Sequence, residues 1–282
     1  MMIVDGIIMS RKMNLINPLV DISFYKFLNN KYISICFIND ITSENITNIN
    51  EIKLINNKNI QIEAENNNNE IILININKEA SGYRANRNEF KQSFNDLSIY
   101  EDAYDKIYNI GIMEFYIRHN FIDESCEVIL YENTYYMKTK DINKENYYIS
   151  IDLPKYEEKL ESNIDKWIFL LKDIDKFDSI YDKEDVFKYA INLFNKENLN
   201  EDEHEKYKIQ LKEYIDCKNE MILSLVKSYS ENMTDNIYEG CIDTIKTMVN
   251  EREMSINKVS EIFKIPQEII IYEAKGGIKC SL

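Results

Sequence analysis

The sequence predicts an α/β fold in which a mixed β-sheet is flanked by helices and followed by a C-terminal helical extension. Apolar and polar residues alternate around residues 60–77, which is the period of a β-strand, and helical spacing of apolar residues dominates from Glu157 onward. The 282 residues are 44% hydrophobic, which is enough for one sizeable core. Few glycines (6) and prolines (3) argue against disorder or fibrous repeats.

A helix is predicted at residues 18–29, because Asn17 supplies a capping side chain and Pro18 suits the first helical position. Its apolar residues recur at helical spacing: Val20, Phe24, Phe27 and Leu28. The next apolar segment, residues 32–41, is predicted to be a buried helix. A short strand is expected at residues 51–55.

A hairpin is the most informative prediction. Even-numbered residues are apolar in residues 60–65 and again in 72–77, and the four asparagines between them favour a turn. A turn centred near Asn68 places Gln61 opposite Asn75, on the face away from the apolar core. Because a slip of one residue would turn polar side chains into the core, burial constrains this register.

The remaining elements follow from the same patterns. A helix is marked by Phe90, Phe94 and Leu97, and strands are predicted at residues 107–115, 126–131 and 147–153. From Glu157 the pattern is helical, with Trp167 in the expected core. After Gly240 we expect one helix and then two short helices that are separated near Pro266.

The charge is unevenly distributed. The net charge is −15, yet residues 1–91 hold ten Lys/Arg and ten Asp/Glu, so the whole excess of negative charge lies in residues 92–282. If any part of the chain binds DNA phosphates, it is therefore the N-terminal third. The candidate DNA contacts are Lys78, Arg84, Arg87 and Lys91. A solvated helix face is the simpler interpretation of the same window.

Cysteine and histidine usage predicts a reducing compartment. The five cysteines contain no C-x-x-C pair, and only His119 and His204 are present to complete a zinc site. The apolar opening of the chain is short and lacks a preceding basic region, so it predicts neither a signal peptide nor a membrane span. We expect a soluble, cytoplasmic protein without membrane contact, and both Met1 and Met9 are compatible with a natural start.

Four segments, in chain order, carry a family resemblance: Asp21 to Lys26 (D-x-x-F-x-K), Phe37 to Ile41 (F-L-N-x-I/L), Ile151 to Lys155 (I-E-L-x-K, followed by Trp167) and the short helical tail from Ser255 to Ala274. Together with the element order, these segments resemble the recombination-promoting nuclease and transposase branch of the PD-(D/E)xK nuclease-like family. The resemblance implies a restriction-endonuclease-like core at residues 10–175. A helical extension would follow at 176–236 and a short helical tail at 237–282.

The resemblance also implies where the chemistry of the family lies. Its hairpin carries an Asp on the first strand and E-x-Q on the second, which hold Mg²⁺ for phosphodiester hydrolysis. In this chain the equivalent positions are Gln61, Asn75 and Asn77, so no catalytic residue is carried over and no cofactor is expected. Amide oxygens are far poorer Mg²⁺ ligands than carboxylates.

Three interpretations of function remain open at the level of the sequence. The first is a nuclease-like protein whose metal-dependent cleavage site is substituted, so that it is inactive or weakly active. The second is an active Mg²⁺-dependent DNA endonuclease with displaced carboxylates, for which Asp21 and Glu63 are the candidates. The third is a non-enzymatic protein-interaction module, with homo-oligomerisation through the acidic helical region.

Overall fold

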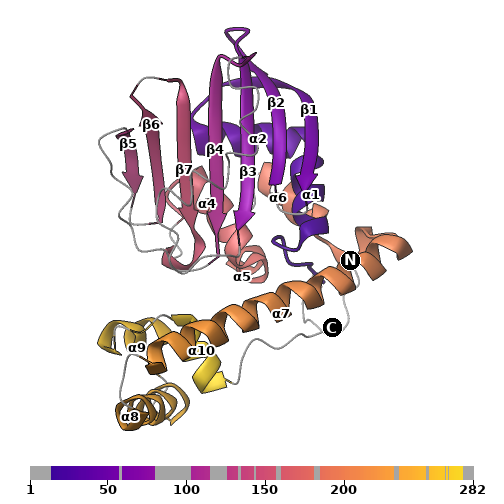
Figure 1. Cartoon of the computed structure of the whole chain (residues 1–282). Helices are drawn as coiled ribbons and strands as arrows, with labels where there is room; N and C mark the ends of the chain where they lie inside the picture. The colour runs from indigo at the N-terminus through magenta and orange to yellow at the C-terminus, as the bar shows by residue number, and fades with distance from the viewer. Residues whose placement is uncertain are drawn as a thin grey trace.

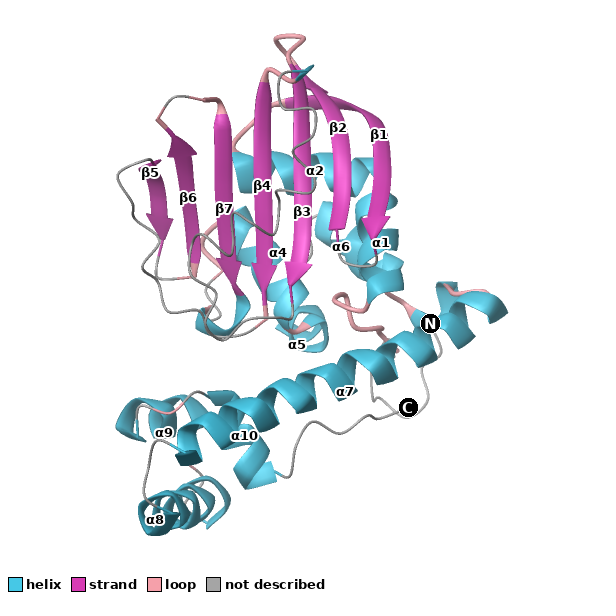
Figure 2. Cartoon of the chain, viewed as in Figure 1, coloured by secondary structure: helices cyan, strands magenta, loops and turns pink. Residues whose placement is uncertain are grey.

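The protein was analysed as a computed structural model, which describes residues 14–56, 59–79, 103–114, 126–132, 135–142, 144–156, 160–180, 185–231, 235–251, 254–263, 265 and 267–275. A seven-stranded mixed sheet lies beside a layer of helices, so the predicted α/β class is confirmed (Figures 1 and 2). The strands stand in the order β1-β2-β3-β4-β7-β6-β5.

The strands have the following bounds: β1 Ile46–Asn56, β2 Asn59–Asn66, β3 Ile71–Glu79, β4 Lys106–Met113, β5 Cys126–Glu132, β6 Tyr136–Asp141 and β7 Asn146–Asp152. The first three form an antiparallel meander. Strand β4 then pairs parallel to both β3 and β7, and β5, β6 and β7 pair antiparallel.

The predicted hairpin is confirmed, including its register. Strands β2 and β3 pair so that Gln61 lies opposite Asn75 and Ile62 opposite Ile74. In the turn, the Asn66 side chain accepts hydrogen bonds from the backbone N–H groups of Asn68 and Glu70, and Asn69 takes a left-handed φ of 60°. Asparagine tolerates that conformation better than most residues, which explains the run of asparagines here.

Five of the described helices pack against one face of the sheet in the main core: α1 Asp21–Asn29, α2 Lys31–Thr42, α4 Asn163–Lys172, α5 Ile174–Ile180 and α6 Asp185–Leu193. Even-numbered isoleucines of β2 and β3 point into this core. Its centre is aromatic, with Trp167 packing edge-on against Phe27 and Phe37 at ring-centroid distances of 5.8 and 5.7 Å. We call this covered side the helix face.

The 31-residue helix α7, Glu201–Glu231, is about 46 Å long and runs past one end of the sheet (Figure 1). Its first half joins the main core through Tyr207, Leu211 and Tyr214. Its second half leads to helices α8 Asp235–Lys246, α9 Ile256–Phe263 and α10 Gln267–Lys275. These three helices enclose a second, smaller core that contains Ile245, Val259 and Ile269.

Some expected elements differ from the structure. Helix α1 begins at Asp21 and not at residue 18, because the Asn17 side chain accepts from Leu19 N–H in a tight turn before the helix. Gly240 lies inside α8 rather than ahead of it. Strand β6 was not predicted. The helix expected around residues 90–97 lies outside the described residues.

The main core continues past residue 175, where we predicted the nuclease-like core to end. Phe177 from α5, and Phe187 and Ile191 from α6, are completely buried in it. The split between α9 and α10 near Pro266 is as predicted.

Candidate functional site

The candidate site is built on the hairpin, at the two positions where the family resemblance expects carboxylates. Gln61 on β2 and Asn75 on β3 are direct cross-strand neighbours, and Gln61 Nε2 donates to Asn75 Oδ1 at 3.2 Å. Both side chains lie on the side of the sheet opposite the helix face, because successive residues of a strand point to opposite sides.

The pair is the start of a chain of amides that crosses four strands. Asn75 Nδ2 donates to Asn109 Oδ1 on β4 at 2.9 Å, and Asn109 Nδ2 donates to Asn146 Oδ1 on β7 at 2.8 Å. Asn146 then donates to the Tyr148 hydroxyl at 3.3 Å. We call these four residues, Gln61, Asn75, Asn109 and Asn146, the amide chain, and the side of the sheet that carries them the amide face.

Three of these four amides are buried, so their hydrogen bonds matter for the stability of the fold. Asn75 is only 1% exposed, and Asn109 and Asn146 are each 4% exposed. A buried amide without partners costs free energy, so each interior member is stabilised by donating to one neighbour and accepting from the other. The amide face at Asn75 is therefore polar and shielded from solvent. The sequence predicted only that this face lies away from the apolar core.

The donor set does not fit Mg²⁺. This cation is usually held by one or two carboxylates together with water. In the amide chain every oxygen belongs to a neutral amide, and the Oδ1 atoms of Asn75, Asn109 and Asn146 already accept hydrogen bonds from their neighbours. The chemistry that this arrangement supports is hydrogen bonding across the sheet, and not stabilisation of a divalent cation.

Asn77, the third substituted position, lies one step along β3. It pairs with Gly111 on β4, which pairs in turn with Ser150 on β7. The Asn77 Oδ1 and Ser150 Oγ atoms are buried, and neither has a hydrogen-bond partner within the part of the chain that the structure describes. Asn77 is thus not a member of the amide chain, although it shares its face.

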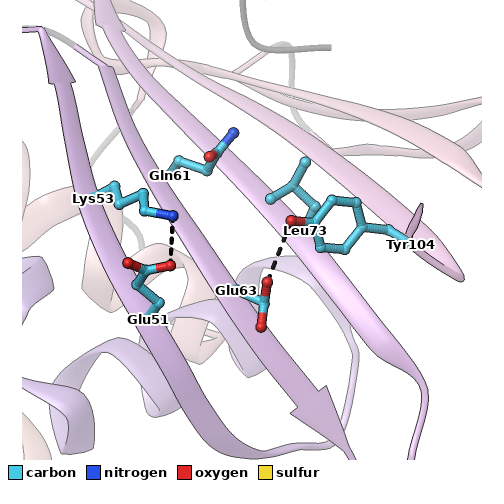
Figure 3. A pocket seen from close by; sticks show the side chains of 6 residues that line it. All are labelled: Glu51, Lys53, Gln61, Glu63, Leu73 and Tyr104. Atoms are coloured by element: carbon cyan, nitrogen blue, oxygen red, sulfur yellow. Dashed lines mark hydrogen bonds and ion pairs between the residues drawn. The ribbon is translucent and has the colours of Figure 1, made fainter. Parts of the chain in front are cut away.

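Glu63, one of the candidate carboxylates, lies on the amide face beside the chain. It lines a shallow pocket together with Glu51, Lys53, Gln61, Leu73 and Tyr104 (Figure 3). Its cavity volume is about 10 Å³, room for about one water molecule, whereas pockets for organic ligands are typically about 300–1,000 Å³. Glu63 accepts from Asn50 and from the Tyr104 hydroxyl, both at 3.3 Å.

Asp21, the other candidate carboxylate, lies on the opposite side of the sheet. It forms an ion pair with Lys78 Nζ at 2.6 Å, and Lys78 also donates to the carbonyl of Leu19. Lys78 alternates with Asn77 along β3 and so points toward the helix face. Asp21 and Glu63 therefore lie on opposite sides of the sheet. They cannot bind the same metal ion, as the displaced-carboxylate hypothesis requires.

The prediction that Lys78 contacts DNA is contradicted by its burial. It is 4% exposed, its ammonium group lies 5.7 Å from the centre of the Phe24 ring, and its charge is paired with Asp21. Sequence patterning could not distinguish a solvated lysine from one that fixes α1 to β3. Arg84, Arg87 and Lys91, the other candidate DNA contacts, lie outside the described residues.

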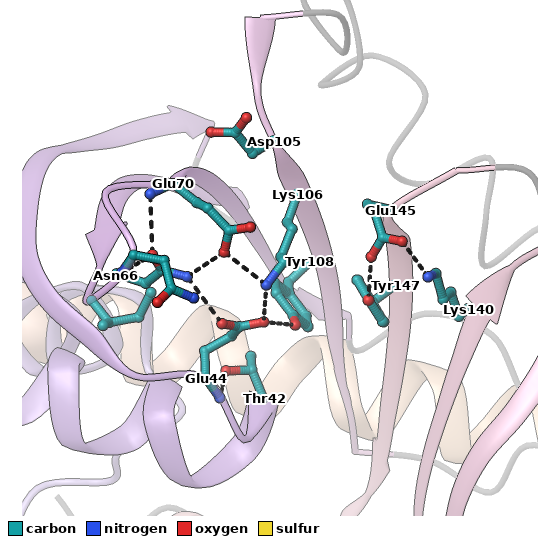
Figure 4. Close-up of polar contacts among 12 residues, drawn as sticks. Thr42, Glu44, Asn66, Glu70, Asp105, Lys106, Tyr108, Lys140, Glu145 and Tyr147 are labelled. Atoms are coloured by element: carbon teal, nitrogen blue, oxygen red, sulfur yellow. Dashed lines mark hydrogen bonds and ion pairs between the residues drawn. The ribbon is translucent and has the colours of Figure 1, made fainter.

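A second polar cluster closes the end of the sheet near the hairpin turn (Figure 4). Glu44 accepts from Lys106 Nζ at 3.1 Å and from the Tyr108 hydroxyl at 2.5 Å, and Lys106 also pairs with Glu70 at 2.9 Å. Burial, followed by the bond to Glu44, raises the pKa of Tyr108, so this hydroxyl remains a donor. The cluster joins α2 to β3 and β4, which is a structural role.

Lys138 on β6 lies under this cluster. It donates to the carbonyl of Thr42 at 2.5 Å and stands over the rings of Tyr108 and Tyr147. Burial lowers the pKa of its ammonium group. These contacts stabilise the ammonium group of a lysine that is only 8% exposed, and they hold β6 against the end of α2.

Sequence reasoning found two members of the amide chain and missed Asn109 and Asn146. The available signal was an asparagine on the same face of neighbouring strands, but asparagine is so frequent in this sequence that a single one carries little information. The order of the strands also had to be known, because β7 is separated from β4 in the chain and adjacent to it in the sheet.

No protein-family model matches the sequence, and no curated protein or solved structure is significantly similar to it. Within the described ranges, no three His, Cys, Asp or Glu side chains gather in a way that could hold a metal ion. Among the helices that the structure describes, none has the length and apolar character needed to span a membrane.

Proposed function

We propose that this chain is a nuclease-like protein in which the hairpin serves as a scaffold and does not cleave DNA. The observation that carries the proposal is the amide chain. Gln61 and Asn75 stand in the register that the resemblance requires of two metal-binding carboxylates, yet they hydrogen-bond to one another and to Asn109.

The order of the elements supports the nuclease-like part of the proposal. Two helices precede three antiparallel strands, and β4 then adds parallel to β3. This agrees with the order of helices, hairpin and later strand on which the resemblance rests. The segment Asp21 to Lys26 also forms the helix that the resemblance assigns to it.

The loss of charge supports the non-cleaving part. Two carboxylates would bring two negative charges to the hairpin, and the two amides bring none. Removing a single preorganised charge-stabilising group typically slows an enzyme by about 10²–10³-fold. Losing the metal that such groups hold is expected to cost at least as much.

The active alternative depends on Glu63 finding other carboxylates. Its cross-strand neighbour Glu51 is the nearest in register, but Glu51 forms an ion pair with Lys53 at 2.5 Å. Asp21 is on the other side of the sheet. Neither Glu51 nor Asp21 therefore offers Glu63 the second, uncompensated carboxylate that a Mg²⁺ site on this face would use.

Cleavage of supercoiled plasmid in Mg²⁺ or Mn²⁺ tests the proposal, with the wild type compared against the variant Gln61→Asp/Asn75→Glu. We expect the wild type to leave the plasmid intact and the variant to nick it. The variant Asn67→Asp/Asn192→Glu is the matched control, because it adds the same charges at exposed positions in the hairpin turn and in α6. Metal-dependent cleavage by the wild type would overturn the proposal.

Since Asn75 is buried, folding of the double variant must be verified by circular dichroism. Gln61→Asp alone, at a half-buried position, keeps the comparison informative if the double variant does not fold. If neither the wild type nor either folded variant cuts, the third interpretation, a protein-interaction module, becomes the better one. The separate helical core of α8, α9 and α10 is the observation that favours it.

Binding of DNA separates these two candidates. A nuclease-like protein that retains nucleic-acid contact will bind duplex DNA, and the binding will weaken steeply as salt rises. In that case replacing Arg84, Arg87 and Lys91 by Ala will weaken retention and lower its salt dependence. An interaction module will show no salt-dependent retention.

A further inference from the structure

Among the strands that the structure describes, β1 forms one edge of the sheet and has β2 as its only neighbour. Edge strands present unpaired backbone groups that can pair with another strand. The first half of β1 is partly protected by α2. The Asn39 side chain bonds to both the N–H and the carbonyl of Ile46, and Lys31 Nζ donates to the carbonyl of Ile49.

The second half of β1 differs from the first. Residues 51–54 pair with β2 without a break in register, between two irregularities that flank them. Leu54 and Ile55 are each 45% exposed, so this stretch combines a regular edge with apolar surface.

We infer that the second half of β1 pairs with the same strand of a second copy of this chain, forming a two-fold, antiparallel dimer. The order of charges along the strand selects a second copy as the partner. Glu51 and Lys53 have opposite charge, lie on the same face and are about half exposed, at 52% and 55%.

The charges also select the register. In a two-fold pairing centred on Ile52, Glu51 of each copy lies opposite Lys53 of the second copy, which gives two opposite-charge pairs. Opposed Cβ atoms in antiparallel strands are about 5 Å apart, close enough for such pairs to interact. Centring on Lys53 instead would place Lys53 against Lys53, and that arrangement is disfavoured.

The test is sedimentation velocity of the full-length protein over a range of concentrations. We expect the wild type to form a concentration-dependent dimer. Glu51→Lys and Lys53→Glu should each weaken dimerisation about tenfold or more, because each change converts both opposite-charge pairs into like-charge pairs. Mixing the two variants should restore the dimer. In the mixed pair, the Glu51→Lys chain carries lysine at positions 51 and 53, and these lysines face the two glutamates of the Lys53→Glu chain.

A matched control is available on α7, where Glu205 and Lys208 form another exposed ion pair at 2.7 Å. Glu205→Lys and Lys208→Glu make the same changes in net charge and should leave dimerisation unaltered. A wild type that stays monomeric, or a dimer that is insensitive to Glu51→Lys and Lys53→Glu, would overturn the inference. So would a mixture that associates no better than its components. None of these results bears on DNA cleavage, so the inference stands or fails separately from the proposed function.

Discussion

Asn109 is the residue on which the amide chain depends most. It accepts from Asn75 and donates to Asn146, and it is 4% exposed. Neutral amides can hold this position because one side chain both donates and accepts, whereas a carboxylate can only accept when ionised. The composition of the site is therefore suited to joining strands.

We predict that Asn109→Leu lowers the free energy of unfolding by about 1–3 kcal/mol, because it leaves a buried donor on Asn75 and a buried acceptor on Asn146 without partners. Urea denaturation at neutral pH measures the change. Asn48→Leu, at an exposed position of β1, is the control and should change stability by less than about 0.5 kcal/mol. Equal effects of the two substitutions would show that the amide chain contributes nothing.

At the scale of elements, the ends of β3 and β4 are joined by charge. Glu70, ahead of β3, accepts from Asn66 and pairs with Lys106 on β4. The bond from Asn66 and then the bond from Lys106 lower the pKa of Glu70 below its ordinary value of 4.5. The folded protein thus binds this proton less tightly than the unfolded chain does.

The stability contributed by Glu70 is present above its unfolded-state pKa and is lost as the pH falls through the lowered folded-state pKa. We therefore predict that acidification from neutral pH to below 4.5 destabilises the wild type more than Glu70→Gln. Urea midpoints at several pH values provide the measurement. Parallel pH profiles for both proteins would contradict the prediction.

Elements with a simple period were predictable from the sequence. The β2–β3 register was predictable because alternating isoleucines leave only one arrangement that buries them. Strand β6 was not, because its buried Lys138 and Thr139 are polar residue types that ordinarily indicate an exposed segment. Lys138 is accommodated by the Thr42 carbonyl and two tyrosine rings, which come from distant parts of the chain.

For the molecule as a whole, the main feature is that the described residues form two separate cores. The sheet and helices α1, α2, α4, α5 and α6 enclose one, while α8, α9 and α10 enclose the other, and α7 contacts both. Periodicity located the short C-terminal helices. It could not show that α5 and α6 complete the first core, since an apolar helix face does not specify what it packs against.

Two cores predict two levels of local stability. Ile269→Ala, at a fully buried position of the small core, should speed amide hydrogen exchange in α8, α9 and α10 and leave exchange in β3 and β4 unchanged. Ile74→Ala, equally buried in the main core, is the matched comparison and should cost about 2–5 kcal/mol in the sheet. Faster exchange in the sheet of Ile269→Ala would mean that the chain unfolds as one unit.

The central claim is that the hairpin carries paired amides where a nuclease would carry metal-binding carboxylates. Titration of Mn²⁺ followed by electron paramagnetic resonance tests it most directly, with the wild type, Gln61→Asp/Asn75→Glu and Glu63→Gln compared. We predict that the double variant binds one Mn²⁺ far more tightly than the wild type does, and that Glu63→Gln behaves like the wild type. Stoichiometric Mn²⁺ binding by the wild type that Glu63→Gln abolishes would contradict the claim.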